Sequence, residues 1–201
     1  MVRFNNNAQD NQKFSESQRL AQNQAATANF VKNKYPYEIF VSDISQIKNL
    51  NKYTKGLVIP KGVKVAVSRM PNSAEQRRTL RKELRQASIL AELGNSVYLI
   101  PERAGYGVRP KDAVVNGILY EFREITGKAR TLEWEFRKAK GKGNDTNVFI
   151  SIESDISKDE TRRRIGMVLK RHPEYTGKII VSFNSFKVEE KIYFWDTSDF
   201  R

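Results

Sequence analysis

Two carboxylates on either side of a tight turn are the residues of this sequence best suited to chemistry on a phosphodiester. Asp112 precedes the dipeptide Asn116-Gly117, and Glu121 follows it, with Arg123 two residues further on. Asn-Gly between two apolar runs is typical of a two-residue type I′ hairpin, because both central residues need a positive φ. In that register Asp112 lies opposite Glu121. Because side chains alternate along a strand, Arg123 shares their face.

Opposed carboxylates repel each other unless a cation compensates them, and two explanations follow. In the first, Arg123 compensates them as an ordinary ion pair on a hairpin surface. In the second, the cluster is functional: the carboxylates bind a divalent metal, or Glu121 and Arg123 act directly on a phosphodiester. A nuclease must activate an oxygen nucleophile and neutralise the charge that grows on phosphate. The residue pattern leaves both explanations open.

The elements that would position this hairpin are predicted from capping residues and strand patterns. Ser73 with Gln76 predicts a helix that ends before Gly94, and Ser157 with Glu160 predicts another that ends before Pro173. Thr131 is expected to cap a helix between them, to about residue 140. The strands are predicted at SVYLIP, the two arms of the hairpin, TNVFISIES, GKIIVSFN and KIYFWD.

This order predicts an α+β fold with a central, mainly antiparallel sheet and flanking helices. The core order is α-β-β-β-α-β, followed by a C-terminal α-β-β. We expect residues 1–34 to form a polar N-terminal arm, partly helical or disordered, because they are rich in Asn, Gln and Ala. Residues 35–70 are expected to be a small β-rich accessory segment or an edge of the main sheet. Residues 71–201 would form the nuclease-like α+β domain.

The charge of the chain indicates a polyanionic partner. Lys and Arg number 36 against 23 Asp and Glu, a net charge of +13. Arg77, Arg81 and Arg85 recur every fourth residue, so they form one helix face that either follows a phosphate backbone or is simply solvated. The nucleic-acid-binding candidates are Arg77, Arg81, Arg85, Arg109, Lys111 and Lys128.

Composition also excludes some chemistries. The chain has no cysteine, which excludes disulfides, thiolate zinc sites and a cysteine nucleophile. No run is long and apolar enough to cross a bilayer or to serve as a signal peptide, so we expect no membrane partner and a cytoplasmic site of action. Delivery from another cell or from a phage particle would need another route. His172, the only histidine, is either an acid-base residue or a basic residue at a helix end.

One part of the chain resembles a known group of nucleases. LAELGNSVYLIPE, then Asp112, the Asn-Gly turn, EFR and TNVFISIES resemble the C-terminal nuclease domains of bacterial contact-dependent growth-inhibition toxins. Similar domains occur in phage head-morphogenesis and other mobile-element proteins. The resemblance covers about residues 87–196.

The resemblance implies one of two mechanisms. Ribonucleases related to barnase, EndoU, colicin D and RelE need no metal and commonly cut tRNA or other RNA. In that case the site would be lined by Arg123, Thr126, Arg130, Thr131 and Arg137. In PD-(D/E)xK nucleases, Asp112 and Glu121 would hold Mg²⁺, and a lysine normally stands where this chain has Arg123. Arginine stays protonated and cannot act as a base, but it clamps phosphate oxygens well.

The sequence therefore favours a metal-independent endoribonuclease toxin that acts on tRNA or other RNA without a cofactor. Glu121 would be the base, Arg123 or Arg137 the cation, and Thr131 or Tyr120 an orienting hydroxyl. The positive charge also suggests an acidic immunity or inhibitor protein as a partner. The alternatives are a Mg²⁺-dependent PD-(D/E)xK-like nuclease on DNA or RNA, and a non-catalytic nucleic-acid-binding or phage and mobile-element accessory protein.

Overall fold

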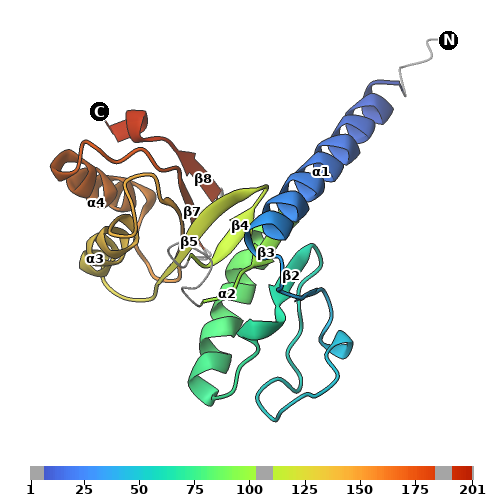
Figure 1. The fold of residues 1–201 in the computed structure, drawn as a ribbon. Helices are drawn as coiled ribbons and strands as arrows, with labels where there is room; N and C mark the ends of the chain where they lie inside the picture. The colour runs from blue at the N-terminus through green and yellow to red at the C-terminus, as the bar shows by residue number, and fades with distance from the viewer. Residues whose placement is uncertain (1–6, 103–110, 184–191, 201) are drawn as a thin grey trace.

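The structure combines helices with one mixed sheet (Figure 1). It is a computed structural model that describes residues 7–102, 111–183 and 192–200, with side chains from residue 16 onwards. The α-helices of this part are α1 (Asn7–Lys34), α2 (Ala74–Glu92), α3 (Ala129–Lys140) and α4 (Lys158–Arg171). The strands are β1 (Phe40–Val41), β2 (Val63–Ala66), β3 (Val97–Leu99), β4 (Ala113–Val115), β5 (Ile118–Ile125), β6 (Asn147–Ile152), β7 (Ile179–Phe183) and β8 (Ile192–Trp195). Short 3₁₀ helices occupy Ile44–Gln46, Val67–Arg69 and Thr197–Phe200.

The sheet confirms the predicted α+β class. In the described chain its strands lie side by side in sequence order, from β1 to β8. Neighbours are antiparallel at β1–β2, β3–β4, β4–β5 and β7–β8, and parallel at β2–β3, β5–β6 and β6–β7. Because β1 and β2 belong to this same sheet, residues 40–66 extend it at one edge.

The β4–β5 hairpin has the predicted register. Asn116 has a φ of 50° and Gly117 a φ of 82°, as a type I′ turn requires. Val115 pairs with Ile118, and Ala113 pairs with Tyr120. The alternation of side chains along β5 therefore follows from the turn.

Helices cover both faces of the sheet. On one face α2 packs on apolar residues of β2 to β6, such as Leu99 and Phe122. On the other face α3 and α4 cover β5 to β7, around Ile125 and Ile150. Figure 1 shows α2 on one side of the sheet and α3 with α4 on the other. Residues of β5 therefore lie between two layers of helices.

Helix α1 contacts the sheet only near its C-terminal end. Val31 and the following Tyr35 pack on Tyr98, Ile100 and Val114, on the face opposite α2. The rest of the helix projects from the body (Figure 1), and most side chains of residues 16–26 are exposed. In the described part of the chain, no helix is long and apolar enough to cross a membrane.

Two of the three predicted caps form, and the third is wrong. The Ser73 hydroxyl accepts from the Gln76 amide at 3.1 Å, and the Ser157 hydroxyl accepts from the Glu160 amide at 3.2 Å. Helix α3 instead begins at Ala129, after Lys128, which provides no side-chain cap. Thr131 therefore lies inside the first turn, because the chain already turns into the helix after Lys128.

Candidate active site

The predicted acidic cluster lies in a gap between two apolar clusters on the face opposite α2. On one side Val114 and Leu119 pack with α1. On the other side Ile125 packs with α3 and α4. Glu121 and Arg123 occupy β5 between these clusters. The hairpin face that was predicted to be polar is therefore polar only around Glu121 and Arg123, and apolar residues lie on both sides of them.

The guanidinium of Arg123 lies among oxygen atoms of the cluster. It forms an ion pair with Glu121, and its Nη1 lies 4.0 Å from Asp112 Oδ2. The same Nη1 donates to the main-chain carbonyl of Phe122 at 2.8 Å. On the outer side, Arg123 Nε lies 3.5 Å from Glu135 Oε2 of α3. Two carboxylates and a main-chain carbonyl therefore hold a cationic group at the centre of the cluster.

Lys142 is a member of the cluster that sequence reasoning missed. Its Nζ lies 2.6 Å from Glu121 Oε1. Lys142 follows α3 along the chain, and α3 runs back beside β5, which returns the chain to Glu121. A lysine in a Lys-Gly segment, 21 residues after the glutamate, carries no sequence signal of this contact.

Lys111 is placed differently from the expected nucleic-acid contact. Its side chain is buried, and its Nζ donates to Thr146 Oγ1 at 2.5 Å and to the Lys142 carbonyl at 3.4 Å. The ammonium group therefore braces the loop that carries Lys142.

Glu121 has an unusual electrostatic environment. It is fully buried. Burial raises its pKa, and the neighbouring Asp112 carboxylate raises it further, whereas Arg123 and Lys142 oppose the rise. In the described residues neither of its carboxylate oxygens has a well-aligned hydrogen bond, although both cations are close. Its proton affinity is therefore higher than that of an exposed glutamate.

Asp112 is held by the main chain of β5 and by a second ion network. Its Oδ2 accepts from the Phe122 amide at 2.7 Å, and its carbonyl accepts from Arg69 at 2.7 Å. Arg69 is buried and lies 2.5 Å from Glu83 Oε2 of α2 and 3.1 Å from Glu102. Burial raises the pKa of Glu83 to about 7, although the charge of Arg69 lowers it. Sequence reasoning missed this network, because Arg69 and Glu83 belong to different elements.

The other predicted catalytic residues do not join the cluster by any contact within the described chain. Thr126, Arg130, Thr131 and Arg137 are exposed. Thr126 follows the end of β5, about 16 Å from Glu121 at 3.3 Å per residue. The structure thus brings together Asp112, Glu121 and Arg123, and it leaves the α3 residues on the surface.

The predicted nucleic-acid residues occupy several environments. Arg77 donates to the carbonyls of Tyr53 and Lys55, at 2.5 and 2.9 Å, and so holds a loop. Arg81 is exposed, and Arg85 is exposed with its guanidinium 2.6 Å from Glu124. Lys128 is exposed beside α3. Arg109 lies outside the described residues.

His172 fits the description of a basic residue at a helix end. It is the C-cap of α4, and its Nδ1 lies 3.1 Å from Lys140 Nζ and 3.3 Å from Glu174 Oε1. Lys140 also binds Glu174 directly, at 2.7 Å. The imidazole is therefore engaged in a surface charge network.

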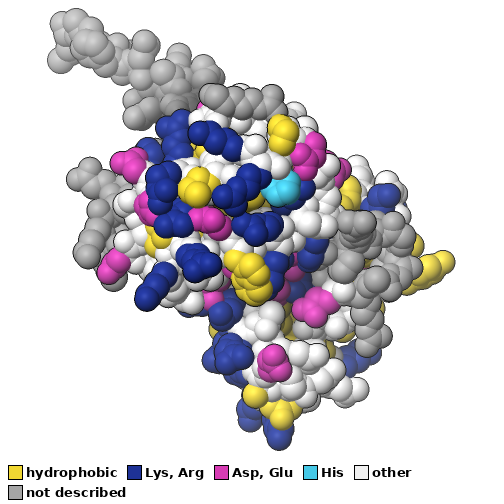
Figure 2. Space-filling model, turned by 90° about the vertical axis from the view of Figure 1, so that its left-hand side faces the viewer, with side chains coloured by type: hydrophobic (Ala, Val, Ile, Leu, Met, Phe, Trp, Pro, Cys, Tyr) yellow, Lys and Arg dark blue, Asp and Glu magenta, His cyan; other side chains and the backbone are white. Residues whose placement is uncertain are grey.

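Lys and Arg side chains gather on the side of the molecule formed by α3 and α4 (Figure 2). The exposed basic residues of these helices are Arg130, Arg137, Lys138, Arg162, Arg163, Lys170 and Arg171. Comparison with protein-family models, with curated proteins and with solved structures finds no match for this chain.

Proposed function

We propose that this protein is a divalent-cation-dependent nuclease that cleaves a phosphodiester bond at Asp112 and Glu121. The observation that carries the proposal is the position of the Arg123 guanidinium, a cation held by both carboxylates and by the Phe122 carbonyl. The net charge of +13 and the basic surface support a nucleic acid as the substrate.

The donor set fits a hard cation such as Mg²⁺. Magnesium takes oxygen ligands, and proteins usually bind it through one or two carboxylates together with substrate phosphates. Asp112, Glu121 and the Phe122 carbonyl would hold it. When bound, it would supply Lewis-acid stabilisation of the phosphate and activation of a water. The described residues contain no group of three or more His, Cys, Asp or Glu side chains placed to hold a metal ion, so substrate oxygens and water would have to supply the remaining ligands.

The arrangement of elements supports the same proposal. Asp112 directly precedes β4, and Glu121-Phe122-Arg123 lies in β5, between α2 and α3 in chain order. Strand β6 is parallel to β5. PD-(D/E)xK nucleases have this core order of helix, three strands, helix and strand. The main departure is Arg123 in the position of the usual lysine.

Lys142 would take the place of the lysine that the motif lacks. Its ammonium group contacts Glu121 from outside the strand, at 2.6 Å. From there the ammonium group would orient the attacking water by donating a hydrogen bond, and the proton that the water loses would pass to solvent. Arg123 would clamp a non-bridging oxygen of the substrate phosphate. Lys111 would keep the Lys142 loop in place.

The geometry supports this mechanism better than metal-free RNA cleavage. A general base must have a free lone pair for the 2′-hydroxyl proton, and Glu121 is already paired with two cations. The hydroxyl and arginines expected to assist it, such as Thr131 and Arg137, are exposed on α3. The acidic pair itself is common to both mechanisms.

The test compares the wild-type protein with Glu121→Gln on total tRNA and on plasmid DNA. Each reaction is run with Mg²⁺ and with EDTA. We expect cleavage by the wild type only with Mg²⁺, and a loss of at least a hundredfold in Glu121→Gln. Glu75→Gln, an exposed position in the first turn of α2 outside the groove, serves as the control and should cleave normally. Cleavage that survives EDTA would select the metal-free ribonuclease, and a wild type inactive on both substrates would refute nuclease activity.

A further inference from the structure

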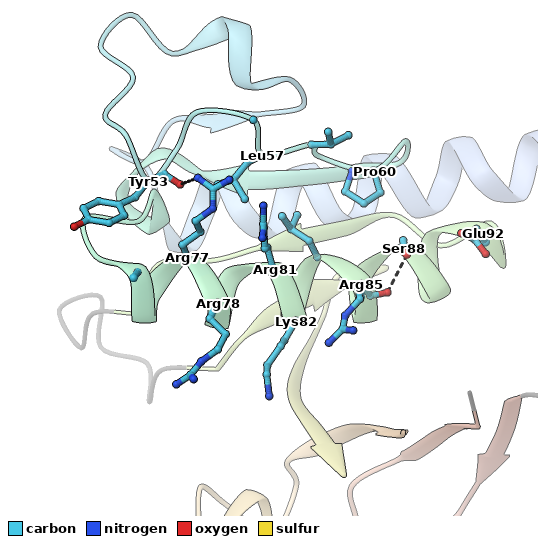
Figure 3. Close-up of a pocket in the computed structure, with 14 residues that line it drawn as sticks. Tyr53, Leu57, Pro60, Arg77, Arg78, Arg81, Lys82, Arg85, Ser88 and Glu92 are labelled. Atoms are coloured by element: carbon cyan, nitrogen blue, oxygen red, sulfur yellow. Dashed lines mark hydrogen bonds between the residues drawn. The ribbon is translucent and has the colours of Figure 1, made fainter. Parts of the chain in front are cut away.

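We infer that a groove between α2 and residues 53–60 binds a single-stranded segment of nucleic acid. Binding of nucleic acid at this groove does not depend on the proposed nuclease function. The groove has a volume of about 860 Å³ and lies on the side of the sheet that α2 covers (Figure 3).

One wall of the groove is apolar and exposed to solvent. It is formed by Leu57, Val58 and Pro60, with Tyr53 at one end and Leu84 of α2. Val58 is 78% exposed and extends the apolar lining formed by Leu57 and Pro60. This wall would contact a flat, apolar group.

Helix α2 contributes cations to the groove. Arg81 projects toward Leu57, whereas Arg78, Lys82 and Arg85, which also line the groove, project from the opposite side of α2 (Figure 3). In the described chain, no acidic side chain forms an ion pair with Arg78 or Arg81. Lys82 and Arg85 share the single carboxylate of Glu124. Positive charge therefore exceeds its compensation here.

The groove is preformed by internal hydrogen bonds. Arg77 donates to the carbonyls of Tyr53 and Lys55, which fixes the loop against α2. Asn51 accepts from the amides of Tyr53 and Thr54 at 2.8 and 3.0 Å. A ligand would therefore bind without first ordering this wall.

Single-stranded nucleic acid fits both surfaces together. Its phosphates would contact Arg81 inside the groove, and Arg78 and Lys82 along the outer side of α2, where Cα positions four residues apart are spaced by about 6 Å along the axis. Its unpaired bases stack or pack on apolar and aromatic walls. A duplex hides its base faces and would use only the cationic rim. Pockets of about 300–1,000 Å³ hold drug-sized ligands, so this groove would hold about one or two nucleotides.

The groove is also coupled to the candidate active site through α2. Gln86 of this helix donates to the Arg123 carbonyl at 2.8 Å, and Lys82 and Arg85 bind Glu124, the next residue of β5. The groove and the acidic cluster therefore lie on opposite faces of the sheet and are linked through β5.

Fluorescence anisotropy with labelled oligonucleotides tests this inference. The Glu121→Gln protein, in buffer with EDTA, is titrated with single-stranded RNA, single-stranded DNA and a hairpin duplex of the same composition. We expect the single strands to bind at least tenfold more tightly than the duplex. Arg81→Glu and Val58→Asp should each weaken single-strand binding about tenfold. Arg81→Glu should also reduce the salt slope by about 0.7.

Arg19→Glu is the matched control, since it makes the same change of charge on the exposed part of α1. It should lower single-strand affinity less than threefold. Equal affinity for RNA and DNA would indicate recognition of phosphates and base faces, and tighter RNA binding would add a contact to the 2′-hydroxyl; both support the groove. The inference is overturned if Arg81→Glu and Val58→Asp bind like Arg19→Glu, or if the duplex binds as tightly as the single strands. It is also overturned if no oligonucleotide binds, which would leave an acidic protein as the occupant.

Nuclease activity and binding at the groove can be refuted independently. If the wild type cleaves nothing with Mg²⁺ but the groove variants lose single-strand binding, nuclease activity is refuted and the groove stands. If Glu121→Gln abolishes cleavage but the groove variants bind normally, only the groove is refuted.

Discussion

Replacing Glu83 by glutamine should change how the stability of this protein depends on pH. Glu83 is buried in α2 beside Arg69, and burial raises its pKa from 4.5 to about 7. A carboxyl with a raised pKa in the folded state stabilises the fold fully below pH 4.5, and this contribution is lost as the pH rises through about 7. The folded protein binds more protons than the unfolded chain across this window.

The size of the effect follows from the same values. At about 1.4 kcal/mol per pH unit, a rise from 4.5 to about 7 corresponds to a ceiling of about 3 kcal/mol. The side chain is only 11% exposed, so solvent screening reduces this value little. Arg69 keeps a hydrogen-bond partner in the variant, because glutamine retains an acceptor oxygen.

Urea denaturation at pH 5 and pH 8 measures the effect. The wild type should lose about 2–3 kcal/mol more of its free energy of unfolding than Glu83→Gln between these pH values. Glu92→Gln, exposed on the same helix, should follow the wild type. Equal losses in the wild type and Glu83→Gln would refute the assignment of a raised pKa to this buried pair.

Three further predictions address the site and the core. Lys142→Met should lower Mg²⁺-dependent cleavage at least tenfold, whereas Lys138→Met, exposed on α3, should retain it; equal rates would remove Lys142 from the mechanism. Phe136→Ala should cost about 3–5 kcal/mol of unfolding free energy by urea denaturation, because the ring is fully buried in the core; a cost below 1 kcal/mol would contradict this packing. Gly177→Ala should cost about 1–3 kcal/mol, since a Cβ would lie 2.1 Å from the Thr146 carbonyl oxygen; unchanged stability in thermal unfolding would show that this approach is relaxed.

Most of the correct predictions about the fold rest on turn and cap residues within short segments of the sequence. The Asn-Gly turn determines which residues of β5 share a face, because the pairing register follows from two adjacent φ values. Ser73 and Ser157 mark helix starts because their hydroxyls accept from amides only three residues away. Thr131 misled the prediction, since a hydroxyl within the first turn has the same residue type as a cap.

For the same reason, the sequence predicted only part of the candidate site. Asp112, Glu121 and Arg123 are linked by one hairpin, so the sequence by itself brought them to one face. Their surroundings depend on contacts between distant segments. Packing of α3 beside β5 brings Lys142 to Glu121, and packing of α2 over the sheet buries Glu83 against Arg69.

The sequence thus determined the class of fold, the hairpin and the basic character of the surface, because turns, caps and charge are properties of short segments. The tertiary structure decided that the carboxylate Glu121 is buried and that a second lysine reaches it. It also decided that Arg81 faces an apolar wall across a groove. Burial and proximity arise only when helices pack on the sheet, so no local pattern encodes them.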